Sequence, residues 1–387
     1  MKEKLPINKD ILIWARTSIG LSIEEVANKF SRSEKVIENW ENGNDSPTFS
    51  QLERLAFEIY KRPLAVFFFP EVPQEETPKT AFRTLPDTII NELPPEIVKL
   101  YRKAKLFQIY LEELFEGQKP VESGFDSLLD KFSITAQSNI AFISQEIRKG
   151  LKISIDEQAK WDSTETAFKS WRSAFEANGI FIFKDAFKND DYSGFCLYDE
   201  KYPVIFVNNS MPDSRQIFTL FHELGHLLFK SGGVDFRSSS YTRLFRDYYL
   251  NIEDACNNFA NEFLVPQNVF DSFELNVSEL QFQKLAEYFS VSREVILRNY
   301  LERGLITQRY YEEMVDIWIK QSQDKKGGGG SYYYNRKAYL GDRYISIVYG
   351  KYYQNKITAD NAAEYLNVKI KNLPAFEHIV MEGGKDK

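Results

Sequence analysis

The spacing of apolar residues over the first 69 positions predicts a compact bundle of short helices. In four stretches, apolar side chains recur three and four positions apart, which is the spacing of one helix face. A polar turn, Ser31-Arg32-Ser33, separates the second stretch from the third, and Gly43 is expected to end the third as a left-handed C-cap. We therefore expect one helical unit over 1–69, followed by a Pro- and Glu-rich linker over 70–95.

Beyond the linker, the apolar pattern is helical, then strand-like, then helical again. Three short apolar runs, GIFIF, SGFCLYD and PVIFVN, are bounded by Gly, Asp and Pro and predict strands of a small sheet. Helices are expected from about Met211 to Phe229 and from about Ile252 to Phe263. The expected segments are a helical connector over 96–160, a mixed domain over 161–323, a Gly-rich linker over 324–331 and a helical C-terminal region over 332–387. The predicted fold class is mainly α (α+β).

Composition describes an ordinary folded protein. Hydrophobic residues make up 43% of the 387 positions and charged residues 27%, which excludes a largely disordered chain. The net charge of −7 excludes a protein whose whole surface coats nucleic acid or an anionic membrane. Two cysteines cannot form a disulfide framework, and no apolar run is long enough to span a membrane. We expect a cytoplasmic protein with reduced thiols and no membrane partner.

One motif carries chemistry. Two of the three histidines lie in the sequence His222-Glu223-Leu224-Gly225-His226, an H-E-x-x-H arrangement. On a helix, residues four positions apart share a face, so both imidazoles can bind one metal ion. Gly225 is a poor helix former, and its presence indicates that another segment approaches this face closely. Before the motif, the sequence Ser210-Met211-Pro212-Asp213 predicts a capping box at the start of the helix.

Two imidazoles leave a hydrolytic metal site incomplete, because such sites use three protein ligands and one open position. His378 is far away in the C-terminal region, so a carboxylate from the following helix is expected as the third ligand. Glu253 is the first candidate and Glu262 is the alternative. Two imidazoles and a carboxylate favour Zn²⁺, which lowers the pKa of a bound water to about 7, although Mn²⁺ could occupy the same donors. Glu223 would then take the proton of that water and pass it to the leaving amine.

Two further elements are candidates for substrate contacts. The strand over 203–208 is a candidate sheet edge with which an extended peptide could pair. Tyr241, Tyr248 and Tyr249 lie between the two predicted ligand segments, and any one of them could donate to a developing oxyanion. The sequence does not choose among the three.

Two stretches of the chain resemble the ImmA/IrrE family of metallopeptidases. These are PVIFVNNSMPDSRQIFTLFHELGHLLF and IEDACNNFANEFLVP. The resemblance implies a zincin-like peptidase domain in which Glu253, rather than Glu262, completes the ligand set of His222 and His226. It also implies a zinc-dependent endopeptidase, in some members latent, with Glu223 as its catalytic residue. Its substrate would be one specific protein, usually a repressor or antitoxin encoded beside it in a stress-response, mobile-element or defence locus.

The N-terminal unit resembles a Cro/C1-type (Xre) helix-turn-helix in SIEEVANKFSRSEKVIENWENGNDSPTFSQLERLA. The resemblance makes duplex DNA a candidate partner and leaves a homodimer open. The candidate DNA contacts are Arg32, Ser33, Lys35 and Asn39. Residues 1–69 hold 10 Lys and Arg against 10 Asp and Glu, a net charge of zero where DNA-binding domains usually carry a basic surplus. The alternative is a regulator or antitoxin that uses the peptidase fold to recognise a partner, such as a PIN-type toxin.

The C-terminal region has its own composition. Residues 331–378 carry 7 Lys and Arg and 4 Asp and Glu, a net charge of +3, together with nine tyrosines. Basic residues among aromatic ones can bind single-stranded nucleic acid, but the favoured interpretation is that these tyrosines pack a helical hairpin or a partner surface. Cys196 and Cys256 are expected to be small buried residues rather than redox sensors or ligands.

Overall fold

The structure of the 387-residue chain is a computed structural model that describes residues 5–19, 21–60, 62–73, 93–120, 138–230, 233–236, 247–323 and 332–382. The chain divides into two compact units, Met1–Lys103 and Ala104–Lys387. The boundary between the units lies inside helix α7 (Pro95–Leu114). Most of the predicted linker over 70–95 and all of the one over 324–331 lie outside the described residues.

The first unit is made of short helices, as the apolar spacing predicts. They are α1 (Lys9–Thr17), α2 (Ile23–Phe30), α3 (Glu34–Glu41), α4 (Phe49–Arg54), the π-helical turn η1 (Leu55–Tyr60) and the 3-10 helix η2 (Leu64–Phe68). Ser31 adopts a left-handed conformation between α2 and α3, and Gly43, with φ +74°, follows α3. An ion pair between Arg16 and the buried Glu41, 2.7 Å long, joins α1 to α3.

The second unit contains a small sheet and most of the helices. The helices after α7 are α9 (Ile140–Leu151), α10 (Ile155–Gln158), α11 (Thr164–Ala177), α12 (Asp213–Leu228), α14 (Asp247–Leu264), α15 (Gln267–Phe270), α16 (Glu279–Phe289), α17 (Arg293–Glu302), α18 (Gln308–Gln323), α19 (Tyr332–Leu340), α20 (Asp342–Tyr353), α21 (Ala359–Tyr365), η3 (Ile370–Asn372) and α22 (Leu373–Glu382). Together with the sheet they confirm the predicted α+β class. Among the described residues, no helix has the length and apolar character needed to cross a membrane.

The sheet has four strands in the order β1-β3-β2-β4. They are β1 (Phe181–Asp185), β2 (Tyr192–Leu197), β3 (Val204–Asn208) and β4 (Gly233–Phe236). The first three match the predicted strands. The prediction of a free edge over 203–208 is wrong, because β3 pairs with β1 on one side and with β2 on the other. Every residue of β3 is buried, as is typical of an inner strand that is covered on both faces.

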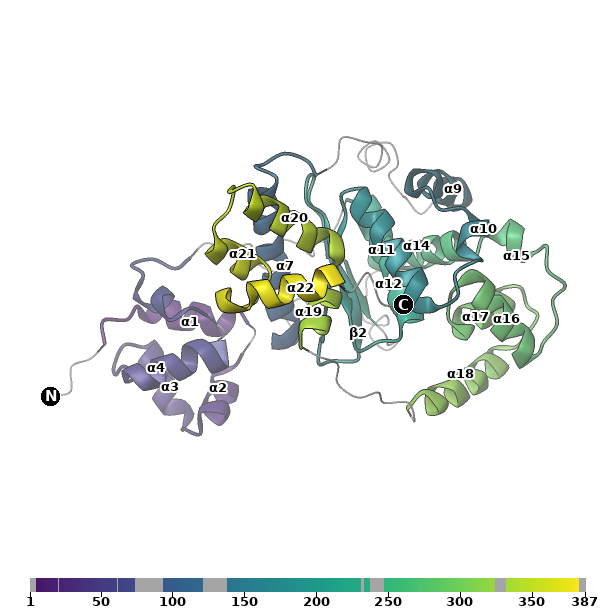
Figure 1. Cartoon of the computed structure of the whole chain (residues 1–387). Coiled ribbons are helices and arrows are strands. Elements are labelled where there is room, and N and C mark those ends of the chain that lie inside the picture. The colour runs from purple at the N-terminus through teal and green to yellow at the C-terminus, as the bar shows by residue number, and fades with distance from the viewer. Residues whose placement is uncertain are drawn as a thin grey trace. The chain divides into compact units, whose positions relative to one another are not determined.

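The two faces of the sheet contact different helices. On one face, Phe107 of α7 stacks on Phe183 of β1, with ring centroids 4.0 Å apart, and Tyr344 of α20 packs edge-on against the same ring. On the other face, Ile182 and Ile205 belong to the core formed with α11, α12 and α14. The sheet therefore lies between the C-terminal helices with α7 and the helix pair α12–α14 (Figure 1).

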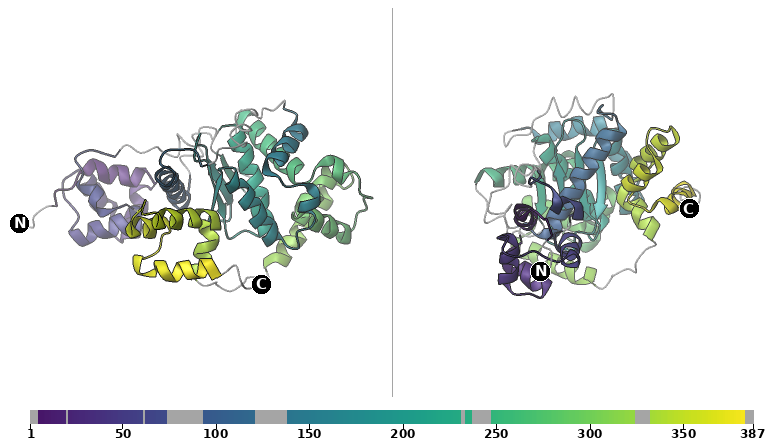
Figure 2. Two further views of the ribbon diagram at one scale, coloured as in Figure 1. Left: turned by 45° about the horizontal axis from the view of Figure 1, so that its top comes forward. Right: turned by 90° about the vertical axis from the view of Figure 1, so that its left-hand side faces the viewer.

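The C-terminal helices form part of the second unit through buried polar contacts. The guanidinium of Arg172 on α11 donates to the carbonyl oxygens of Ala338 and Tyr339 at the end of α19, and forms a 2.8 Å ion pair with Glu176. The hydroxyls of Tyr344 and Tyr349 donate to backbone carbonyl oxygens of Tyr365 and Leu373, and those of Tyr353 and Tyr365 donate to the carboxylates of Glu377 and Glu113. Figure 2 shows the C-terminal helices beside α7 in two further views. These contacts agree with the favoured interpretation that the tyrosines serve packing.

Candidate metal centre

The H-E-x-x-H sequence lies in α12, as predicted. Ile217, Leu220, Leu224 and Leu228 form an apolar stripe in the core of the unit. The predicted capping box at Ser210 is not formed: the helix begins at Asp213, its N-cap is Pro212, and no side chain caps it. The reason is local, because the backbone amide of Ser210 donates to the side chain of Asn208 at the end of β3 instead.

Two glycines allow α12 to lie unusually close to its neighbours. A Cβ atom placed on Gly225 would lie 3.0 Å from the sulfur of Cys256 and 3.1 Å from its Cα, so α14 passes directly over this position. A Cβ on Gly194 of β2 would lie 2.4 Å from the Cγ2 of Thr219 on α12. The sequence interpretation of Gly225 as a point of close approach is confirmed, and the approaching segment is α14.

The close approach brings a carboxylate of α14 to the two imidazoles. Glu253 has one carboxylate oxygen 3.3 Å from the Nε2 atom of His222 and the other 3.0 Å from the Nε2 atom of His226. The two Nε2 atoms lie 3.1 Å apart. All three side chains are buried, and their ligand atoms form the group that could hold a metal ion.

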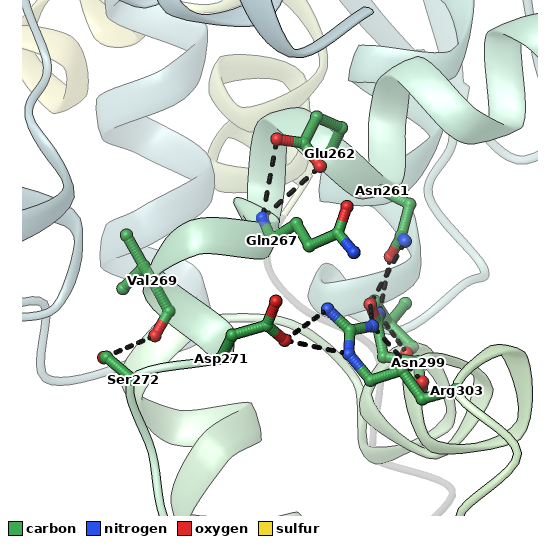
Figure 3. Close-up of polar contacts among 9 residues, drawn as sticks. Asn261, Glu262, Gln267, Val269, Asp271, Ser272, Asn299 and Arg303 are labelled. Carbon is green, nitrogen blue, oxygen red and sulfur yellow. Dashed lines mark hydrogen bonds and ion pairs between the residues drawn. The ribbon is translucent and has the colours of Figure 1, made fainter.

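Glu262, the alternative third ligand, lies two turns further along α14 and has a different role. Its carboxylate oxygens accept from the backbone amide of Gln267 at 3.3 and 3.4 Å, where α15 begins (Figure 3). A carboxylate at this place satisfies one of the amides that a helix leaves free at its N-terminus. Partial burial raises the pKa of Glu262, and the backbone hydrogen bond opposes that rise.

Charge and hydrogen bonding favour an ionised carboxylate in the cluster. Burial alone would raise the pKa of Glu253, but the charge of His226 and the close contacts with both imidazoles outweigh it and lower that pKa. The Nδ1–H group of His222 donates to the Oδ1 atom of Asn257, one turn beyond Glu253 on α14, over 3.1 Å. The Nε2 atom of His222 therefore carries the lone pair, and it is directed at the cluster.

The dimensions of this cluster fit a tetrahedral zinc ion. With metal–ligand bonds of 2.0–2.1 Å, the ligand atoms of a tetrahedral site lie about 3.3 Å apart. The three separations are 3.0, 3.1 and 3.3 Å. The donors are two imidazoles, which bind a metal ion in their neutral form, and a carboxylate, and all three side chains are buried. The residues present thus fit a divalent metal ion.

The remaining candidate residues lie as follows. Glu223 is fully buried on α12, next to His222 and one turn before His226. Tyr241 and the side chains of Tyr248 and Tyr249 lie outside the described residues, so the oxyanion candidates stay predictions. Cys196 and Cys256 are buried and lie outside any disulfide, and neither belongs to the described metal-binding group.

In the first unit, the candidate DNA contacts surround the turn between α2 and α3. Arg32, Ser33 and Lys35 are exposed, and Asn39 is partly exposed. Ser33 is the N-cap of α3 without a side-chain hydrogen bond, while Ile37 and Trp40 of the same helix are in the core.

Two features near the cluster were not predicted from the sequence. The first is the contact of Asn257, although its position four residues after Glu253 places both on one face of a helix. Strand β4, directly after α12, was also missed. It pairs with β2 and is an end strand of the described sheet.

Part of the chain matches a known protein family. Residues 175–300 match the family described as the IrrE N-terminal-like domain, a peptidase family. The match covers about a third of the chain and does not include the N-terminal helices, so the helix-turn-helix stays a prediction. No curated protein and no solved structure gave a match. The segment from the end of α11 to α17, which holds His222, Glu223, His226 and Glu253, is therefore similar to the metallopeptidase-like ImmA/IrrE family.

Proposed function

We propose that the protein is a zinc-dependent endopeptidase that cleaves one specific protein. The observation that carries the proposal is the buried triangle of His222, His226 and Glu253, formed beside Glu223 within a segment that is similar to a peptidase family. The triangle matches the ligand set of hydrolytic zinc sites, which leave a fourth position open.

The chemistry divides between the metal and the protein. Zn²⁺ at this site would lower the pKa of a water molecule to about 7 and polarise the scissile carbonyl group. Glu223 takes the proton from the attacking water on its carboxylate and later delivers it to the leaving nitrogen. His222, His226 and Glu253 hold the donor geometry. The burial of Glu223 keeps bulk water from competing for its proton.

The substrate is proposed to lie along β4. The first and last strands of the described sheet are β1 and β4, and α19 packs on β1. β4 follows directly after the H-E-x-x-H helix and contacts it, so a peptide paired with its outer edge would run past the cluster. The substrate class is a repressor, an antitoxin or a toxin encoded by a neighbouring gene, as the resemblance implies.

The test is a pair of variants assayed against the purified products of the neighbouring genes. Glu223→Gln should retain stoichiometric zinc by elemental analysis and lose cleavage by a factor of about 10² to 10⁴, the usual contribution of a general base. Asp254→Asn is the control, because Asp254 is an exposed carboxylate next to Glu253 on α14. Cleavage by Glu223→Gln at the wild-type rate would refute the assigned role of Glu223.

A second function, binding of duplex DNA by the first unit, is supported by the exposure of Arg32, Ser33 and Lys35 around the start of α3. The zero net charge of residues 1–69 predicts weak binding that is lost at moderate salt. A mobility shift with the DNA upstream of the gene, repeated across salt concentrations, tests this function. Absence of retardation at low salt would remove it and leave a protein-recognition role for these helices.

A further inference from the structure

One face of α14 carries three polar residues at intervals of one turn. Glu253, Asn257 and Asn261 are four positions apart, so they follow one another along the same side of the helix. Each has a partner on another helix. Glu253 meets both imidazoles of α12, Asn257 meets His222, and Asn261 exchanges two hydrogen bonds with Asn299 of α17.

The contact of Asn257 determines which way the His222 ring points. An amide oxygen only accepts, so the Nδ1 atom of His222, 3.1 Å away, must carry the proton. In the neutral ring the Nε2 atom then carries the lone pair, 3.1 Å from the Nε2 atom of His226 and 3.3 Å from Glu253. Without the acceptor, the imidazole could carry its proton on either nitrogen and could rotate about its χ2 torsion.

The next turn of α14 keeps Asn257 in place. Asn299 is buried, with 2% of its surface exposed, and its amide nitrogen donates to the side chain of Asn261 over 2.7 Å. Arg303 donates to the side-chain oxygen of Asn299 over 3.1 Å and forms a 3.0 Å ion pair with Asp271 after α15 (Figure 3). Since Asn299 is buried and bonded to both Asn261 and Arg303, the contact resists rotation of α14 about its axis.

We propose that Asn257 is a positioning residue for the metal centre: it fixes His222 in the Nδ1–H tautomer with Nε2 toward Glu253 and His226, while the Asn261–Asn299 pair holds α14 in the rotation that this contact needs. The proposal rests on the metal site of the proposed function but not on its substrate. Partners of this kind commonly contribute 10- to 100-fold to metal affinity.

The experiment compares Asn257→Ala and Asn257→Asp with Asn258→Ala as the matched control. Asn258 is the neighbouring asparagine on α14 and is exposed. The full-length chain is labelled with ¹⁵N-histidine, and long-range ¹H–¹⁵N spectra of the metal-free protein identify the protonated nitrogen of each ring. Only three histidines contribute, and His378→Gln removes the signals of the third. Zinc affinity is measured separately by competition with a chromophoric chelator.

We expect His222 of the wild type and of Asn258→Ala to carry its proton on Nδ1. Asn257→Ala should lose that preference and bind zinc 10- to 100-fold more weakly. Asn257→Asp keeps an acceptor oxygen and should restore both the tautomer and an affinity close to that of the wild type. A purely structural role predicts instead that both variants weaken zinc binding equally.

Two results would overturn the proposal: an unchanged tautomer and affinity in Asn257→Ala, or a loss in Asn257→Asp as large as that in Asn257→Ala. If Asn257→Ala does not fold, Asn257→Asp still tests the proposal. His222 of that variant must keep the Nδ1–H tautomer of the wild type, and its loss would refute the role of Asn257. Failure of the wild type to cleave any protein would refute the proposed function alone. Failure to bind zinc would refute the metal centre and leave the tautomer measurement as the test of ring positioning.

Discussion

Gly225→Ala tests whether the distance between α12 and α14 controls metal binding. The added methyl carbon would lie 3.0 Å from the sulfur of Cys256 and 3.1 Å from its Cα and Cβ, whereas ordinary contacts begin at 3.4 Å. The two helices must therefore separate locally by about 0.3–0.4 Å, because interiors are too densely packed to absorb the overlap elsewhere. Glu253 precedes Cys256 by less than one turn and moves with it.

The expected effects on stability and on metal binding differ in size. Overpacking costs about 1–3 kcal/mol, and replacing a helical glycine by alanine returns about 1 kcal/mol, so the free energy of unfolding should fall by only about 0–2 kcal/mol. Metal sites tolerate distance errors of about 0.2 Å. A larger displacement of Glu253 from His222 and His226 should lower zinc affinity at least about tenfold, which corresponds to about 1.4 kcal/mol.

Chelator competition and denaturant unfolding of the metal-free protein measure the two quantities separately. Gly350→Ala is the matched control, since Gly350 lies in α20 and has no atom within 4 Å of the added methyl position. That variant should gain up to about 1 kcal/mol in stability and bind zinc like the wild type. If Gly225→Ala also binds zinc with wild-type affinity, the close approach does not determine the ligand geometry and the reasoning is wrong.

Two further predictions concern parts of the second unit outside the cluster. Gly341 has φ +84°, and a Cβ atom there would lie 2.4 Å from the guanidinium of Arg172. Gly341→Ala should therefore lower the free energy of unfolding by at least about 2 kcal/mol. A change below about 0.5 kcal/mol in denaturant titration would contradict this account of how α19 docks. Burial lowers the pKa of Lys184 on β1 to about 8, with a smaller contribution from the charge of Arg172. Between pH 8 and the unfolded pKa of about 10.4, the unfolded state binds more protons than the folded state, so stability rises with pH through this group. Relative to Lys184→Met, the wild type should gain about 1 kcal/mol between pH 8 and pH 9, and an equal pH dependence of the two proteins would refute the assignment.

The parts of the molecule that depend on local sequence could be predicted. The H-E-x-x-H spacing places two imidazoles on one turn whatever surrounds it, and the apolar runs that predicted β1, β2 and β3 are strands in the structure. The choice between Glu253 and Glu262 could not be made from spacing. Both lie on α14, and only the packing of that helix against α12 determines which carboxylate reaches His222 and His226.

Strand order is the clearest case in which the sequence was insufficient. The run at 203–208 was expected at an edge, yet β3 is inserted between β1 and β2, parallel to the first and antiparallel to the second. That order depends on how the connections cross the sheet, which short apolar runs do not encode. The unbroken apolar run from Val204 to Val207 was the available signal, because a strand with no polar alternation is covered on both faces and is more often an inner one.

The cluster therefore combines a local feature with a global one. α12 supplies two donors by itself, but the third donor and the orientation of His222 both come from α14, whose C-terminal end is held by other helices. Arg148 of α9 donates to the carbonyl oxygen of Phe263, and Gln158 of α10 donates to that of Leu264 over 3.0 Å. Because these contacts, together with Asn261 and Asn299, determine where α14 lies, metal affinity depends on the packing of the whole unit, whereas peptide hydrolysis additionally requires Glu223. Variants that weaken metal binding and variants that abolish only cleavage should thus separate into two groups, and Glu223→Gln is the only substitution discussed above that belongs to the second.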